Sequence, residues 1–162
     1  GKKLVFMGSE LGQLREWDEK REQDWDVLKY PIHDSFSVFM RKLCRLYLKK
    51  PVLSRWDDDP NGFAWLDCDS ALRRCYTIIR KCDGEKPIVA VFNFSENIQD
   101  GYTFNIGKGK RMTLLLDSTA DEFSGCAPHY RKTCKAGKDG SVKLDVPRLS
   151  AAYYEISDVP TK

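Results

Sequence analysis

The chain opens with a short, continuous apolar run, Leu4-Val5-Phe6-Met7, which is ended by Gly8. A run without polar alternation is typical of a strand buried on both faces, as in a parallel α/β sheet. Such a strand needs parallel neighbours joined through crossover helices, and no second strand–helix–strand pattern follows it. We therefore expect the chain to begin at the last strand of a sheet whose other strands lie outside this sequence.

A helical pattern lies between His33 and Lys50, where apolar residues recur at spacings of three and four. Asp34 or Ser35 is expected to cap its N-terminus, and Pro51 follows its end. Cys44 falls within the apolar face, where a free thiol acts as a small hydrophobic group. The residues of the predicted stripe are Phe36, Phe39, Met40, Leu43, Leu46 and Tyr47.

From Asp57 onward, short alternating runs are separated by turn signals such as Asp59-Pro60-Asn61-Gly62 and Cys82-Asp83-Gly84-Glu85. Seven strands at this spacing indicate an antiparallel β-sandwich. The polar stretch 118–137 is expected to be a long irregular loop. The predicted strands are 63–67, 74–81, 87–94, 101–106, 111–117, 142–146 and 152–156.

Between Gly8 and the helix lies a loop that mixes tryptophans with charged and amide side chains. In α/β architectures, the loop after the C-terminal end of a strand is where ligands bind. Indole faces can stack on a pyranose while planar polar groups bind its hydroxyls; alternatively, the tryptophans are local packing anchors. The candidate sugar-binding residues are Glu10, Gln13, Arg15, Trp17 and Trp25, with Trp17 favoured for stacking and Glu10 as a hydrogen-bonding organiser.

The string GKKLVFMGSELGQLREW, followed by Asp24-Trp25, resembles the end of the catalytic barrel of bacterial 1,4-α-glucan (glycogen) branching enzymes, in the α-amylase superfamily. Residues 41–53 resemble the last barrel helix, 59–66 the start of the C-terminal β domain, and 88–94 a strand that ends in the family's Asn-Phe pair. The resemblance implies a mostly β fold. Residues 1–50 would be the final strand, loop and helix of a truncated (β/α)8 barrel, and residues 51–162 an all-β sandwich.

The resemblance also implies the chemistry. A branching enzyme cleaves an α-1,4 bond and transfers the chain to a 6-hydroxyl to form an α-1,6 branch. A retaining mechanism of this kind needs two carboxyl groups about 5 Å apart. The family's motifs for its catalytic carboxylates are absent from this sequence, so no catalytic residue is assigned. The pair His33-Asp34 resembles a catalytic signature, but it stands at a helix start, where capping is expected.

Two other interpretations compete with an inactive C-terminal piece whose sandwich supports the barrel. One is a self-standing carbohydrate-binding module, which would present a row of exposed aromatic residues on one sheet face. Trp56 and Trp65 are the residues whose exposure tests it. The other is the same region of another α-amylase-family hydrolase, against which the Glu16-Trp17 and Asp24-Trp25 pairs argue.

The charge and cysteine patterns limit the kinds of molecule that the chain is expected to bind. A net charge of +3, from 27 basic and 24 acidic residues in mixed order, gives no footprint for nucleic acid or membrane. No cysteine pair has CxxC spacing, so a structural metal site is not expected. No cofactor is expected either, and a cytoplasmic location would keep the thiols free. α-Glucan is the expected partner, with self-association through the exposed surface of the barrel remnant. The cysteines are Cys44, Cys68, Cys75, Cys82, Cys126 and Cys134.

Overall fold

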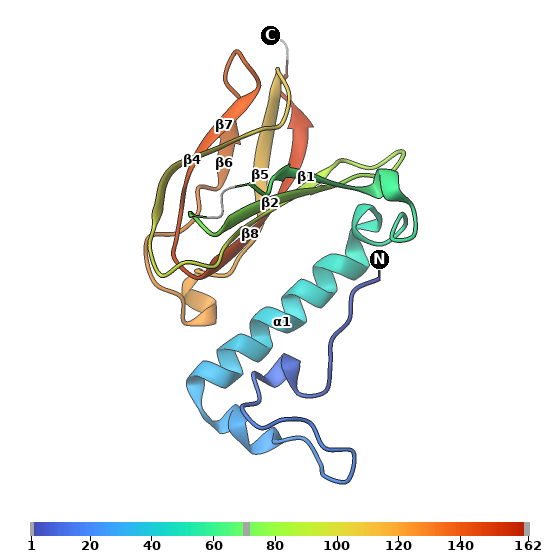
Figure 1. The fold of residues 1–162 in the computed structure, drawn as a ribbon, viewed down its shortest axis with the longest axis vertical. Helices are drawn as coiled ribbons and strands as arrows, with labels where there is room; N and C mark the ends of the chain where they lie inside the picture. Colours follow the sequence, from blue (N-terminus) through green and yellow to red (C-terminus); the bar gives the residue numbers. More distant parts are fainter. Residues whose placement is uncertain (1, 70–71, 161–162) are drawn as a thin grey trace.

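The structure is a computed structural model that describes residues 2–69 and 72–160. An N-terminal segment with two short 3-10 helices leads into one long helix, and an antiparallel β-sandwich follows (Figure 1). The helical elements are η1 Ser9–Leu11, η2 Trp25–Lys29, α1 Pro31–Lys49, η3 Pro51–Leu53, η4 Pro60–Gly62 and η5 Asp121–Phe123. The strands are β1 Phe63–Asp67, β2 Cys75–Arg80, β3 Ile88–Asn93, β4 Gln99–Asn105, β5 Lys110–Asp117, β6 Thr133–Lys135, β7 Ser141–Val146 and β8 Ser150–Asp158.

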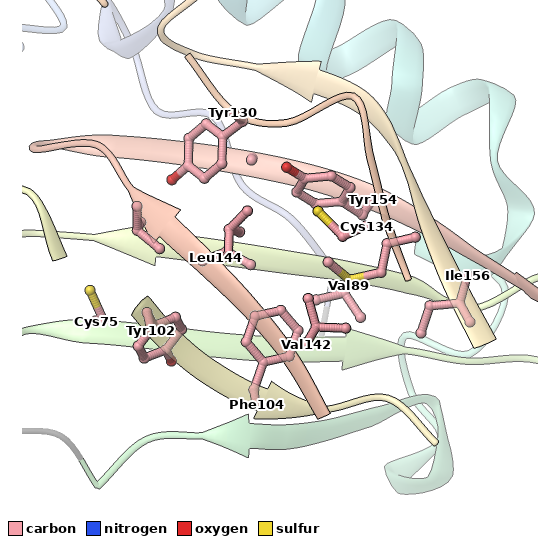
Figure 2. Packing of buried hydrophobic residues seen from close by; sticks show 14 of the residues in the cluster. Cys75, Val89, Tyr102, Phe104, Tyr130, Cys134, Val142, Leu144, Tyr154 and Ile156 are labelled. Carbon is pink, nitrogen blue, oxygen red and sulfur yellow. The ribbon is translucent and has the colours of Figure 1, made fainter. Parts of the chain in front are cut away.

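The strands form a six-stranded sheet in the order β1-β2-β3-β8-β5-β6 and a two-stranded sheet of β4 and β7. Strand alternation places one face of each sheet in the shared core. Figure 2 shows Tyr102, Phe104, Val142 and Leu144 of the small sheet facing Val89, Tyr154 and Ile156 of the large sheet. The hydroxyls of Thr77 and Tyr102 are 2.9 Å apart and join the two sheets inside this core.

The predicted mostly β, antiparallel fold is confirmed, and each of the seven predicted strands forms. The hairpin expected at Cys82-Asp83-Gly84-Glu85 joins the antiparallel pair β2–β3, and Gly84 supplies the positive φ of +75° that this turn requires. The expectation of an irregular loop at 118–137 is wrong at Thr133–Lys135. This three-residue strand pairs with β5, and its Cys134 side chain is buried in the core.

The strand predicted at Leu4–Met7 does not form. Within the described residues this segment is extended but has no ladder partner, and its side chains are exposed, Leu4 at 82 %. A strand buried on both faces depends on neighbours for its hydrogen bonds, so the apolar run alone cannot produce one. The run instead ends in a turn, in which Ser9 N donates to Phe6 O at 2.8 Å.

The helix α1 begins at Pro31, earlier than the capping residues expected at Asp34 or Ser35. Proline suits the first helical position because its fixed φ is preorganised and its missing N–H would have no intrahelical partner there. The N-cap is therefore Tyr30, whose side chain makes no capping hydrogen bond. Asp34 lies within the first turn, and His33 contacts a backbone carbonyl of the preceding loop, so the capping role expected of this pair is wrong.

The apolar stripe of α1 contacts the rest of the chain at two places. Near its C-terminus, Leu46 and Tyr47 pack on a small cluster that contains Val52 and Ile88. Near its middle, the Phe39 ring meets Phe123 edge-on at 5.3 Å. Ion pairs flank these contacts, Lys42 with Glu122 and Lys50 with Glu155. The prediction that Cys44 faces this apolar surface is wrong, because its side chain is exposed.

One buried carboxylate joins the helix, the N-terminal segment and the sandwich. Asp57, 6 % exposed, accepts a hydrogen bond from Arg80 Nη2 of β2 at 2.8 Å and another from Tyr47 Oη of α1 at 2.8 Å. Lys3 Nζ donates to the same carboxylate. Both charges of the Asp57–Arg80 pair are buried. Arg80 Nε is buried without a hydrogen-bond partner among the described residues, so the guanidinium depends on Asp57 for its compensation.

Replacing Asp57 by Ala should lower the free energy of unfolding by about 3 kcal/mol, because the Arg80 guanidinium would stay buried without its counter-charge. Urea unfolding measures the loss. Asp58→Ala is the matched control, an exposed neighbour for which a change within about 0.5 kcal/mol is expected. Equal losses in the two variants would contradict the role given to Asp57.

The same carboxylate should make stability depend on acid pH. Burial by itself raises the pKa of Asp57, but hydrogen bonds from Lys3 and Tyr47 and the charges of Lys3 and Arg80 bring it below its ordinary value of 3.8. This stabilisation is complete above the ordinary value and is lost as the pH falls below it through the folded-state pKa. Urea midpoints measured between about pH 5 and pH 2 should therefore fall more steeply for the wild-type chain than for Asp57→Ala.

Candidate functional site

The loop that carries the candidate sugar-binding residues starts with a compact turn at η1. Gly8 and Gly12 flank this turn with φ values of +86° and +63°. A Cβ on Gly8 would lie 2.9 Å from the Gln13 side chain, so glycine is needed there for both space and backbone conformation. Leu11 is buried, and its carbonyl oxygen lies 2.9 Å from His33 Nδ1, which ties the turn to α1.

Arg15 holds the rest of the loop together. Its Nη2 lies 3.0 Å from Asp24 Oδ1, and its Nε lies 3.2 and 3.3 Å from the two carboxylate oxygens. Nη2 also donates to Glu22 O at 2.8 Å. The hydrogen bond to Asp24 raises the pKa of the Arg15 guanidinium above its ordinary value, so the cation persists throughout the physiological range.

Gln13 closes the same network from the other side. Its Nε2 donates to Arg15 O at 3.0 Å, and its Oε1 accepts from Asp24 N at 2.9 Å. The structure therefore brings Gln13 and Arg15 together around Asp24, and Trp25 follows directly as the first residue of η2. Arg15 therefore makes most of the hydrogen bonds that hold this loop together. The role predicted for Glu10, a hydrogen-bonding organiser beside the active site, stays a prediction.

Glu10 and Trp17 lie apart from this network. Glu10 belongs to η1, and its Oε2 is buried with no hydrogen-bond partner among the described residues; Gln23 Oε1 is in the same state. Trp17 packs edge-on against Phe6, with ring centroids 5.5 Å apart and planes at 85°. Its side chain nevertheless remains 45 % exposed. The contact with Phe6 suits a packing anchor, and the exposed surface suits a stacking platform.

Trp25 borders a shallow depression with a cavity volume of about 460 Å³. Glu22, Asp24 and Asp26 supply acidic groups to its lining, and Tyr30 and Lys29 complete one side. Trp25 is 50 % exposed, so about half of its surface can still be contacted by a ligand. A flat aromatic surface beside carboxylates is the arrangement that binds a pyranose through its C–H face and its hydroxyls.

Two residues of this region were not among the candidates, Asp24 and His33. A carboxylate nine positions after an arginine carries no periodic signal, so the Arg15–Asp24 pair was not recognisable. His33 was assigned to helix capping because of its place in the sequence, and its contact with Leu11 O depends on how the loop folds back.

The described residues contain no group of three or more His, Cys, Asp or Glu side chains that could hold a metal ion. All six cysteines are free, and Cys75, Cys82 and Cys134 are buried. Burial raises the pKa of the Cys75 thiol to about 11, which keeps it protonated and unreactive at neutral pH. Within residues 2–69 and 72–160, no helix has the length and apolar character needed to cross a membrane.

Replacing Arg15 by Ala should loosen the loop. Without the guanidinium, the backbone at 22–24 loses its side-chain anchor, and hydrogen exchange at the Asp24 amide should become about tenfold faster. Arg21→Ala is the matched control, since Arg21 is an exposed arginine of the same loop. Unchanged exchange in Arg15→Ala, measured by mass spectrometry or NMR, would show that the loop is held by other contacts.

Comparison with known proteins gives relatives over nearly the whole chain. The 1,4-alpha-glucan branching enzyme GlgB of Thiobacillus denitrificans is 38 % identical over 162 residues, which cover 96 % of this chain and 22 % of the relative. The enzyme of the same name from Pseudomonas putida is 39 % identical over 155 residues, covering 92 % and 21 %. The chain thus spans about a fifth of the length of these relatives.

A solved structure shares the fold at much lower identity. It is the catalytic module of the multi-modular glycogen-degrading pneumococcal virulence factor SpuA, in complex with an inhibitor. The match has a TM-score of 0.56 at 15 % identity and covers 84 % of this chain and 20 % of that one. The family described as alpha amylase, C-terminal all-beta domain, matches residues 65–157. This match spans β1 to β8, and the chain belongs to the family of alpha-amylase C-terminal all-beta domains.

Proposed function

We propose that the chain is the C-terminal part of a bacterial 1,4-α-glucan branching enzyme. The parent enzyme is a cytoplasmic transferase of glycogen synthesis that cleaves α-1,4 glucan and moves the freed chain to a 6-hydroxyl. One observation carries this proposal. The similarity to branching enzymes covers 96 % of the chain, whereas the family of β domains matches only residues 65–157. The additional similarity therefore includes the loop and α1, which precede the β domain.

We propose that the chain consists of two parts with different structural roles. Residues 1–50 belong to the end of the catalytic barrel, and residues 51–162 form the sandwich that supports it. The Asp57 carboxylate supports this division, because it fastens Tyr47 of α1 to Arg80 of β2 and so holds the helix against the sandwich. Gly1 and residues 70–71 and 161–162 lie outside the described part of the chain.

The loop 8–25 is proposed to form one wall of the glucan-binding cleft in the whole enzyme. Arg15 and Gln13 act by holding the loop in shape, while Trp17 and Trp25 offer half-exposed indole surfaces for stacking. Glu10 lies in the turn at η1, and its Oε2 is buried without a partner among the described residues, so its proposed role is to organise the wall of the cleft and not to contact the glucan through that oxygen. The partner is an α-glucan such as glycogen or an amylose-like chain, and neither cofactor nor metal is involved.

The chain alone is proposed to be inactive, since it lacks the family's catalytic carboxylates. It is also expected to self-associate, because Leu4–Met7 and part of the α1 stripe are apolar and exposed. A carbohydrate-binding module is the competing function, and it predicts glucan affinity in the isolated chain.

The purified chain should neither branch nor hydrolyse amylose. Iodine staining and counting of reducing ends measure the two reactions, with the full-length enzyme as the positive control. Calorimetry with maltoheptaose should give a Kd weaker than about millimolar, because the cleft lacks its opposite wall. Reproducible turnover would overturn the assignment of catalysis to the preceding part, and a Kd near micromolar would favour the binding module.

In the full-length enzyme, Trp17→Ala should lower kcat/KM roughly tenfold. An aromatic stacking contact stabilises by on the order of 1 kcal/mol, and each 1.4 kcal/mol is a factor of ten in rate. Phe6→Ala is the matched control, because it removes the edge contact with Trp17 and leaves the indole in place. If both variants lower the melting temperature equally and keep kcat/KM at low temperature, Trp17 is a packing residue.

A further inference from the structure

A cavity opens at the end of the sandwich where β8 finishes. It has a volume of about 540 Å³ and lies between the ends of the two sheets, beside the connection from β2 to β3 and the turn from β4 to β5. Figure 1 shows β8 running towards the C-terminus at this end, on the opposite side of the sandwich from the loop 8–25. The described residues that line the cavity include none of that loop.

The floor of this cavity is aliphatic. Ile79 of β2 and Ile156 of β8 belong to the sandwich core and are 6 % and 4 % exposed. Leu66 of β1 and Ile106, which follows β4, pack against the same core and are half-buried. No aromatic side chain lines the cavity among the described residues, so no ring is available to stack on a sugar or a nucleobase. The floor therefore suits an aliphatic group.

Lysine side chains gather at the rim of the cavity. Lys81 and Lys86 reach it from the connection between β2 and β3, and Lys110 from the start of β5. Lys81 is exposed and forms no ion pair within the described part of the chain. Lys86 Nζ lies 3.6 Å from a carboxylate oxygen of Glu155, and Lys50 binds that carboxylate more closely. Neither Lys81 nor Lys86 therefore has a carboxylate of its own.

The other carboxylates beside the cavity are already paired. Arg55 Nη2 lies 3.5 Å from Glu85 Oε1, and Lys110 Nζ lies 2.5 Å from Asp158 Oδ1. The cations at the rim thus outnumber the carboxylates that could neutralise them. An excess of positive charge above an apolar surface favours a ligand that joins an anionic group to an apolar one.

We propose that this cavity binds a small aliphatic anion, in which a short alkyl chain carries a carboxylate or a phosphate group. The chain lies on the aliphatic floor, and the anionic group lies between Lys81 and Lys86. A volume of about 540 Å³ is within the range of small-molecule sites, roughly 300–1,000 Å³. An inorganic anion would leave the floor uncovered, and a neutral chain would leave the excess charge at the rim. The site does not depend on the proposed function.

Methyl NMR of the 162-residue chain with hexanoate locates the site and measures its affinity. Hexanoate should shift the signals of Ile79, Ile106 and Ile156. Its Kd from these shifts should be at least about tenfold lower than that of acetate, which lacks the buried methylene groups. It should also be about fivefold lower than that of 1-hexanol, which lacks the charge. Hexyl phosphate is compared with hexanoate, and whichever binds more tightly identifies the preferred anionic group.

Lys81→Met removes the charge and keeps the length of the side chain. It should raise the Kd of hexanoate about fivefold and leave that of 1-hexanol unchanged, because only the anion contacts the ammonium group. Lys132→Met is the matched control, since Lys132 is an exposed lysine that does not line the cavity, and its Kd values should equal those of the wild-type chain. Both substituted residues are exposed, so the melting temperature should stay the same in both variants.

Three results would overturn the proposal. One is the absence of shifts at Ile79, Ile106 and Ile156 at about 50 mM hexanoate. Another is a shift confined to Ile32, which is 72 % exposed beside α1, because hexanoate would then bind the exposed apolar surface there. The third is a Kd of hexanoate that is the same in Lys81→Met as in Lys132→Met, because the rim would then make no contact with the anion.

Discussion

The arrangement of this chain depends on the buried carboxylate of Asp57. Its partners come from three separate parts of the sequence: Lys3 in the N-terminal segment, Tyr47 in α1 and Arg80 in β2. A buried charge is costly unless it is paired and hydrogen-bonded, so the three partners are held to one geometry. Leu46 and Tyr47 pack on the neighbouring apolar cluster close to this carboxylate, so the polar and apolar contacts hold α1 in the same position.

The β-sandwich could be predicted from the sequence because its signals are local. Alternation with period two marks each long strand, and turn residues such as Gly84 mark where the chain reverses. Thr133–Lys135 escaped prediction because three residues are too few to show alternation, and pairing with β5 defines this strand. The sheet order, with β8 between β3 and β5, also rests on distant contacts that no local pattern encodes.

The N-terminal part shows the opposite case. Leu4–Met7 has the composition of a buried strand, yet strand formation needs a partner that composition cannot supply. In the candidate site, the sequence identified Trp17 and Trp25 as candidate stacking residues, but it could not predict which residues they and the rest of the loop would contact. Arg15 and Asp24 are joined by the path of the loop, and the contact between Phe6 and Trp17 likewise depends on the fold.

The Arg15–Asp24 bridge has a consequence for recognition. It joins two residues that are nine positions apart in the sequence, and the Gln13 side chain bonds to the backbone at both ends of the segment between them. The loop therefore loses its conformational entropy when the chain folds and not when a ligand binds. A molecule that stacks on Trp25 meets a preorganised surface, and its affinity is not reduced by the entropy of ordering the loop.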